Sequence, residues 1–398
     1  MALPSSCRLF VEQGLCMRRA VRQAVRTVWE SGFGGCKSHQ VTRQLSFTPV
    51  PRDFRRRGPL SRTAPYCHEE GGSENTGSGV AVWSALAFSL FGSKDERTEA
   101  QKMEDEIILL LKKAKYNMML GELDAANGFL HKAIRLAHQS HNNDAIIYTY
   151  SLMANLAFVQ GELDSAEKLF KAAMSFMLSG GTPQDDNAVI EMSLKLASIY
   201  ATQNKHELAE HGFQFCTESL EAKLEKQKDL PPDAISAEEE RKDTRLLLGL
   251  SLDARARYLA SSRRLIGACR DYRQALQICQ EEQGEAHPQT LVLMSDLATM
   301  LDLQGKHDEA LAQVRKAVEL GQAFGNPEQH VLLGNMAGIL MHKGEFEESA
   351  KLFKEALALA QAVGDAEAVE QCEEGLKELS RRRGEKTHTT DKESSVKQ

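Results

Sequence analysis

Apolar and small residues recur at steps of three and four along most of this chain, most clearly from Tyr150 to Met174. The apolar positions continue on both sides of Gly161, which is typical of two amphipathic helices joined by a tight turn. Glycine is suited to end the first helix because it takes the left-handed cap conformation without strain. We expect Phe170 to fill the space between this helix pair and the next one.

The same frame fits five other stretches of the chain. The turn positions are Gly121, Gly161, Asn204, Arg263, Gly305 and Gly344. Five positions after each turn comes a small residue: Ala126, Ala166, Ala209, Ala268, Ala310 and Ser349. Four positions further comes a larger apolar residue: Leu130, Phe170, Phe213, Tyr272, Val314 and Phe353. Three more give a second small residue: Ala133, Ala173, Cys216, Ala275, Ala317 and Ala356. The Arg263 copy is the weakest, because arginine replaces the turn glycine.

A small residue, an aromatic residue four positions on, and a second small residue together resemble the tetratricopeptide repeat. Six copies in one frame outweigh the alternative of ordinary helical hairpins that match by chance. The resemblance implies an all-α fold, a superhelical solenoid of about six tetratricopeptide-like helix pairs over residues 100–380. The copies are spaced more widely than the usual repeat of roughly 34 residues, and the stretch at 287–310 is most similar to the kinesin light-chain variant.

Charge divides the chain into two unequal parts. Residues 1–68 hold 12 Lys and Arg against 3 Asp and Glu, whereas the remainder holds 37 against 53. A basic arm on an acidic body favours targeting and disfavours nucleic acid as a partner of the body. The eight cysteines include no CxxC pair, which indicates a reducing compartment.

The basic arm has the character of a targeting signal. Residues 7–30 are amphipathic, with Arg18, Arg19, Arg22 and Arg26 at helical spacing, which predicts a mitochondrial transit peptide over 1–62. The alternative is a basic tail that binds nucleic acid. We expect this arm to be disordered, and the composition of 63–79 predicts a flexible linker.

A short apolar segment follows at 80–93, in which the strongly apolar run covers only residues 80–91. About twenty apolar residues are usual for a bilayer span. Two interpretations stay open at this stage: a candidate membrane anchor, which we favour, or a helix that packs on the first repeat.

Interruptions mark the repeat boundaries. A turn-rich loop is predicted at 179–187, and an insertion at 221–243 contains the helix-ending pair Pro231-Pro232. We expect a capping helix over 365–379 and a disordered polar tail over 381–398.

The sequence offers no set of catalytic residues. It contains no G-x4-G-K-[ST] phosphate loop and no G-x-S-x-G elbow. His206 and His211 are five residues apart, whereas a zinc-protease helix needs a spacing of four. We therefore predict a protein that is not an enzyme and that uses no cofactor and no metal.

The family resemblance also implies where a partner binds. In this repeat the first helix of each pair lines the concave face, and side chains there form a groove for an extended protein segment. The predicted groove residues are Lys115, Asn155, Phe158, Ser198, Asp253, Arg257 and Asp302. Their mixed character suits a protein partner, and the full lysine and asparagine clamp of chaperone-binding members is absent.

Residues 143–216 and 287–299 resemble a mitochondrial branch of this family. That resemblance implies a protein of the inner mitochondrial membrane with its repeats facing the matrix. It further implies partners among the complex III subunits and a role in assembling or maintaining respiratory complex III around its Rieske iron–sulfur subunit. The alternatives are a cytosolic kinesin light-chain-like adaptor, which would lack the basic arm, and an enzyme hidden in the insertions.

Overall fold

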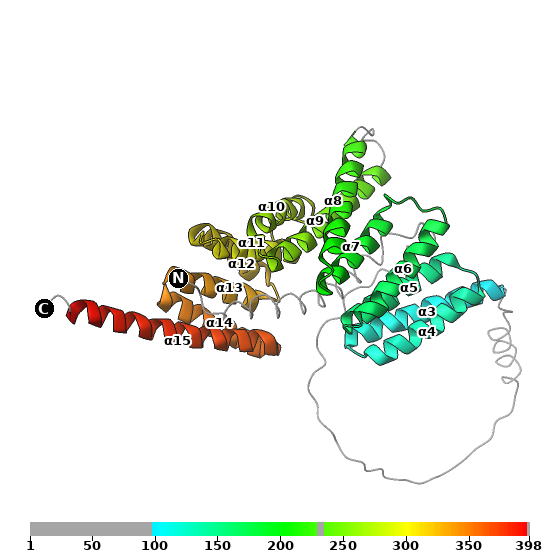
Figure 1. Cartoon of the computed structure of the whole chain (residues 1–398). Helices are drawn as coiled ribbons and strands as arrows, with labels where there is room; N and C mark the ends of the chain where they lie inside the picture. Colours follow the sequence, from blue (N-terminus) through cyan, green and yellow to red (C-terminus); the bar gives the residue numbers. More distant parts are fainter. Residues whose placement is uncertain (1–97, 229–234, 396–398) are drawn as a thin grey trace, which may run out of the picture.

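The computed structural model describes residues 98–228 and 235–395, and their regular structure is entirely helical (Figure 1). The helices are α3 (Glu99–Leu120), α4 (Leu123–Gln139), α5 (Asn143–Val159), α6 (Leu163–Ser179), α7 (Asn187–Thr202), α8 (His206–Lys228), α9 (Ile235–Ser261), α10 (Leu265–Gln283), α11 (Pro288–Leu303), α12 (His307–Phe324), α13 (Gln329–Lys343), α14 (Phe346–Val363) and α15 (Ala366–Ser395).

These helices form six antiparallel pairs, from α3–α4 to α13–α14, and α15 closes the series. Each pair packs on the next one along the chain, so the predicted all-α solenoid of six helix pairs is confirmed. Several first helices also contact the first helix of the next pair: α7 contacts α9, and α11 contacts α13. Within the described part, second helices make no comparable contact with one another. The first helices therefore lie on the inner side of the curve.

The repeat frame corresponds to the packing between helices. All twelve small positions of the frame have no exposed surface, and the six larger positions between them are buried. Small residues allow the two helices of a pair to approach closely, and the larger side chain fills the space beside them. Phe170 is 1% exposed and belongs to the core shared by α5, α6 and α7, as the sequence predicts.

The turns also follow the predicted frame. All six turn positions have positive φ, including Asn204 at 57° and Arg263 at 59°. Arg263 was expected to weaken its copy, yet its backbone takes the same left-handed conformation as Gly161 or Gly305. Packing of α9 against α10 holds this turn, since the two helices make one of the most extensive contacts in the chain.

The predicted loop falls between two helices, whereas most of the predicted insertion is helical. Residues 180–186 separate α6 from α7, and the insertion extends α8 to Lys228 before α9 begins at Ile235. The C-terminal boundary differs from the expectation, because α15 continues past residue 380 to Ser395. Arg381 and Arg382 both bond the carboxylate of Glu378 one turn earlier, which supports helix where a polar tail was predicted.

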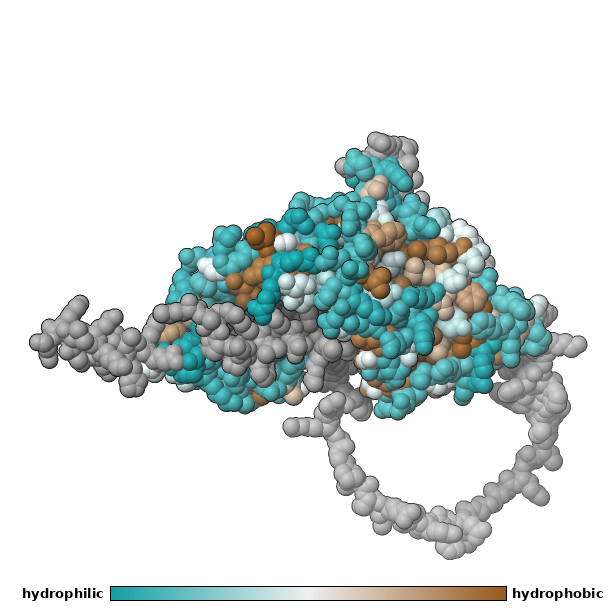
Figure 2. All heavy atoms as spheres, viewed as in Figure 1, coloured by the Kyte–Doolittle hydropathy of each residue, from teal (hydrophilic) through white to brown (hydrophobic). Residues whose placement is uncertain are grey.

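The transit peptide, the linker and the 80–93 segment lie outside the described residues. Among the helices of residues 98–228 and 235–395, none is long and apolar enough to cross a membrane. Figure 2 shows a mostly hydrophilic face, with hydrophobic side chains gathered over the half that holds α3 to α7 and over part of α10 to α12.

Candidate functional site

The inner face of the solenoid is built from the first helices α3, α5, α7, α9, α11 and α13. The structure places all seven predicted groove residues on these helices. Lys115, Phe158, Ser198 and Arg257 are partly exposed, whereas Asn155, Asp253 and Asp302 are buried. The seven residues are thus spread over five repeats. A bound segment would contact the three buried residues only where one of its groups enters between the helices.

Two charged residues of α9 form a unit. The Arg257 Nη2 lies 3.0 Å from Asp253 Oδ2, one helical turn away, and the Asp253 side chain is 1% exposed. Gln289 on α11 also donates from Nε2 to Asp253 Oδ2 at 3.5 Å. Arg257 therefore neutralises a buried carboxylate besides presenting a guanidinium to the inner face.

Lys195 on α7 lies next to this unit and was missed in the sequence. Burial lowers the pKa of Lys195, and the positive charge of Arg257 lowers it further, while the Glu191 carboxylate partly offsets both effects. Lys195 on α7 and Arg257 on α9 are thus close enough for their charges to interact between neighbouring repeats. An incoming carboxylate would relieve their repulsion, since opposite charges at close range stabilise both ionised forms.

The N-terminal end of the inner face, on α3 and α5, carries a hydrogen-bonding side chain and a lysine that contacts an aromatic ring. Asn155 donates from Nδ2 to the carbonyl of Ser151 at 2.9 Å, while its buried Oδ1 accepts no hydrogen bond. A buried acceptor without a donor costs free energy, and an approaching backbone N–H could satisfy it. The Lys115 Nζ lies 5.1 Å from the ring centre of Tyr148, which fixes this lysine between α3 and α5.

Asp302 is held by two histidines rather than by solvent. Its Oδ1 and Oδ2 lie 2.7 Å from His307 Nδ1 and 2.6 Å from His342 Nδ1. His307 comes from the following helix and His342 from α13, so the carboxylate joins two repeats. A second link joins the same two first helices, because Asn335 of α13 donates from Nδ2 to Ser295 Oγ of α11 at 2.7 Å.

Ser198 makes a local contact only. Its hydroxyl donates to the carbonyl of Leu194 on its own helix at 2.9 Å. Phe158 packs at the edge of the core shared by α5, α6 and α7. Of the predicted residues, the structure pairs Asp253 with Arg257. Asn155 and Phe158 share α5, and Lys115, Ser198 and Asp302 each lie on a different repeat.

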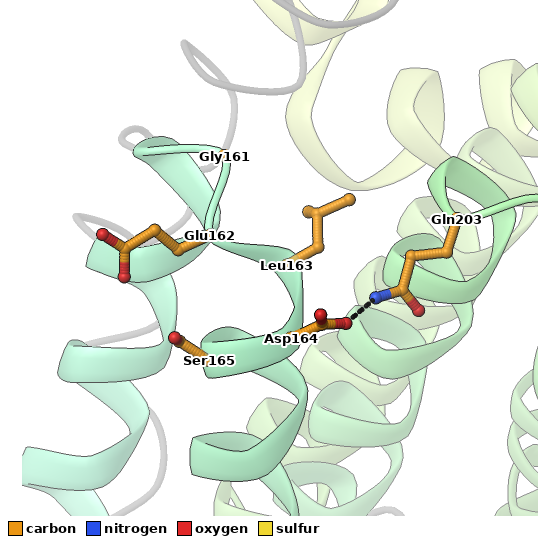
Figure 3. Close-up of a pocket in the computed structure, with 6 residues that line it drawn as sticks. All are labelled: Gly161, Glu162, Leu163, Asp164, Ser165 and Gln203. Atoms are coloured by element: carbon orange, nitrogen blue, oxygen red, sulfur yellow. Dashed lines mark hydrogen bonds between the residues drawn. The ribbon is translucent and has the colours of Figure 1, made fainter.

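A shallow, open hollow lies at the turn between α5 and α6. Figure 3 shows it lined by Gly161, Glu162, Leu163, Asp164, Ser165 and Gln203. Gln203 Nε2 donates to Asp164 Oδ1 at 2.8 Å across its wall. The hydrogen bond ties α6 to the end of α7, and the lining holds neither a base paired with a nucleophile nor a cluster of metal ligands. Within the described residues no group of three or more His, Cys, Asp or Glu could hold a metal ion.

The residues that sequence inspection missed share one signal. Lys195 and Asn335 lie on first helices, three or four residues from a position that the frame assigns to the inner face, whereas Ser295 is itself one of those positions. Polar residues at helical spacing from an assigned inner-face position are the pattern that finds them.

Comparison with known proteins agrees with the repeat frame. Tetratricopeptide repeat models match residues 247–323 and 332–367. The chain is 70% identical over 396 residues to the Danio rerio protein named "Tetratricopeptide repeat protein 19, mitochondrial", and the match covers 98% of each chain. The chain belongs to the mitochondrial tetratricopeptide repeat protein 19 family. The Homo sapiens member is 55% identical over 223 residues, which are 56% of this chain and 58% of that protein.

Among solved structures, the apo form of RapI is similar with a TM-score of 0.51 at 12% identity, over 71% of each chain. That likeness shows the fold alone. Membership of the tetratricopeptide repeat protein 19 family makes this chain a mitochondrial, protein-binding repeat scaffold of a generally non-enzymatic kind.

Proposed function

We propose that this member of the tetratricopeptide repeat protein 19 family is a non-enzymatic scaffold that binds complex III subunits, the Rieske iron–sulfur protein among them, during assembly or maintenance of respiratory complex III. The observation that carries the scaffold role is the inner face, on which polar and charged groups of successive repeats follow one another from α3 to α13. The choice of complex III follows from the resemblance of residues 143–216 to the mitochondrial branch of the family.

The chemistry of the inner face supports an extended, partly acidic protein segment as ligand. Lys195 and Arg257 are basic groups near the middle of the solenoid, and Asn155 offers a buried acceptor to a backbone N–H. Nucleic acid is disfavoured, because residues 98–398 hold 35 Lys and Arg against 48 Asp and Glu. A solenoid spreads modest contacts over several repeats, so no single residue should dominate binding.

The test is capture of the Rieske subunit by variants imported into mitochondria. Asn155→Ala or Lys195→Met alone should weaken co-purification a few-fold, and the pair should weaken it on the order of tenfold or more. The matched control replaces Asn127 and Arg315 with alanine on the second helices α4 and α12. Undiminished capture by the inner-face pair would mean that another surface binds the partner.

Arg257 needs a different substitution. Replacing it with alanine would leave the buried Asp253 carboxylate without its neutralising partner, and such losses typically cost about 3–5 kcal/mol of stability. Arg257→Gln combined with Asp253→Asn removes both charges together. This pair should lower capture of the Rieske subunit several-fold while circular dichroism and the melting temperature stay near those of the unmodified chain.

We further propose that the protein acts on the matrix face of the inner mitochondrial membrane and that the arm directs its import. Deleting residues 1–62 should leave the protein in the cytosol, because the basic amphipathic segment is then missing. Fractionation of cells that express the deletion checks this, and an unchanged mitochondrial location would contradict it.

A further inference from the structure

One helix of the solenoid presents an apolar face that no described element covers. Four large hydrophobic side chains of α3 are exposed, namely Leu109 at 50%, Tyr116 at 62%, Met119 at 57% and Leu120 at 59%. These residues follow one another at helical spacing opposite the buried face of α3, which holds Ile107, Leu111 and Ala114 among others. No other described helix contributes more than two exposed large hydrophobics.

The position of α3 in the solenoid accounts for this face. Each later first helix packs against the second helix of the preceding pair, as α5 does on α4, α11 on α10 and α13 on α12. For α3 the preceding part of the chain lies outside the described residues. The stripe from Leu109 to Leu120 therefore lies where a preceding second helix would pack.

Two exposed lysines, Lys112 and Lys113, lie three or four residues from both Leu109 and Tyr116, on the same face of α3. Lys113 places its Nζ 5.9 Å from the ring centre of Phe129 on α4, so this lysine is turned away from the stripe. Lys112 is exposed, and its long stem can pack beside a covering helix while the ammonium stays in water. Exposed acidic residues, Glu104 and Glu106, occupy the first half of the helix, which disfavours an anionic membrane surface as the covering group.

We propose that the apolar run at 80–91 packs as a helix on this face of α3 and acts as the missing second helix before the first repeat. The run carries no charge and includes Trp83, Leu86, Phe88, Leu90 and Phe91. It ends seven residues before Thr98, the N-cap residue of α3. A covalent tether this short gives the run a high effective concentration at this surface, so it binds there in preference to a second chain.

The distances allow this arrangement. In a helix with a rise of about 1.5 Å per residue, Leu109 and Leu120 lie roughly 16 and 33 Å from Thr98 along the axis. A twelve-residue antiparallel helix would span about 18 Å and cover the stripe. Its last residue would then lie about 18 Å from Thr98 when the axes are about 9 Å apart. The seven-residue step from Phe91 to Thr98 reaches about 23 Å when extended.

The experiment places a photo-crosslinking residue on the stripe of the full-length chain, as Tyr116→p-benzoylphenylalanine, in isolated mitochondria. Tyr116 is exposed, so the substitution leaves the buried face of α3 intact. The expected product is an intrachain crosslink between position 116 and residues 80–91, mapped by mass spectrometry. The matched control is Ile266→p-benzoylphenylalanine on α10, an even more exposed apolar site, which should give no product with residues 80–91.

Hydrogen exchange tests the proposed contact between residues 80–91 and α3 without a crosslinker. Leu86→Asp should speed hydrogen exchange of α3 amides on the order of tenfold in lipid-free buffer. Tyr116→Asp should do the same, and the two substitutions together should add little to either one. Three outcomes would each overturn the proposal. They are a crosslink from position 116 to lipid, a crosslinked product of doubled mass, and α3 hydrogen exchange that is unchanged by Leu86→Asp. The first of these would favour a membrane anchor, and the second a dimer through α3.

Discussion

Three residues other than glycine take the left-handed backbone conformation within the described chain: His141, Asn204 and Arg263. A left-handed residue with a Cβ costs roughly 1–2 kcal/mol relative to the right-handed region, and asparagine bears this better than arginine. At Arg263 the cost is offset by the contacts between α9 and α10 and by the cap that follows, in which Arg264 N–H donates to the carbonyl of Leu259 at 2.8 Å. The conformation at this turn is thus imposed by the helices on either side.

We expect Arg263→Gly to raise the free energy of unfolding by about 1 kcal/mol, because glycine takes φ near 59° without strain. Gly305→Ala, at the equivalent turn with φ of 78°, should lower it by a similar amount. Urea denaturation of both variants checks the pair. A loss of stability in Arg263→Gly would mean that the arginine side chain contributes more than its backbone costs.

At the scale of the helix, close approach decides how neighbouring elements pack. The structure shows one such contact between α7 and α8, where a Cβ on Gly212 would lie 2.7 Å from the Cβ of Ala197. A polar link holds the next helices: Arg255 of α9 makes a two-bond contact with the buried Asp271 of α10 and donates to Thr217 of α8. Three helices of two repeats are therefore joined by one guanidinium group.

Gly212→Ala should destabilise the protein by about 1–3 kcal/mol, since the Cβ of Ala197 is fixed to the backbone and cannot turn aside. The control is Gly128→Ala on α4, where no atom lies within 4 Å of the new Cβ. There alanine should stabilise by about 0.5–1 kcal/mol through its higher helix propensity. Thermal melts that fail to separate the two variants would contradict the close approach of α7 and α8.

Over the whole molecule, the cysteines of the repeats serve as buried packing residues. Cys216, Cys269, Cys279 and Cys372 are all buried and unbridged. Burial raises the pKa of Cys216 and of Cys279 to about 12, and that of Cys372 to about 11. The thiols thus remain neutral in the folded state over a range in which the unfolded chain ionises.

Stability should therefore fall as pH rises above about 9, the ordinary thiol value. The unfolded chain then loses protons that the folded chain keeps until about pH 11 to 12, so the unfolded state is favoured. Urea midpoints at pH 8 and pH 10.5 measure the effect. A variant with Cys216→Ala and Cys279→Ala should show a smaller loss between these two values, and an equal loss in both proteins would contradict the assignment.

The sequence by itself determined the repeat frame, the helix pairs and the turn positions. Each of these depends on residues close together in the chain, because helical periodicity and the volume of a side chain act within a turn or two. Ala166, Phe170 and Ala173 are buried as their pattern predicts. The same local rule placed the turn at Arg263 but rated that copy the weakest, and past residue 380 it predicted a tail where α15 continues.

Only the tertiary structure decided the depth and neighbours of the inner-face residues. Asp302 accepts from His342, 40 residues away, and Lys195 lies near Arg257 on the next repeat. These neighbours depend on the register between repeats, which varies with the length of each insertion and with how far one helix slides along another. The exposed stripe of α3 could not be predicted from the sequence either, because its apolar spacing is that of any amphipathic helix. Only packing shows which of its two apolar faces is covered.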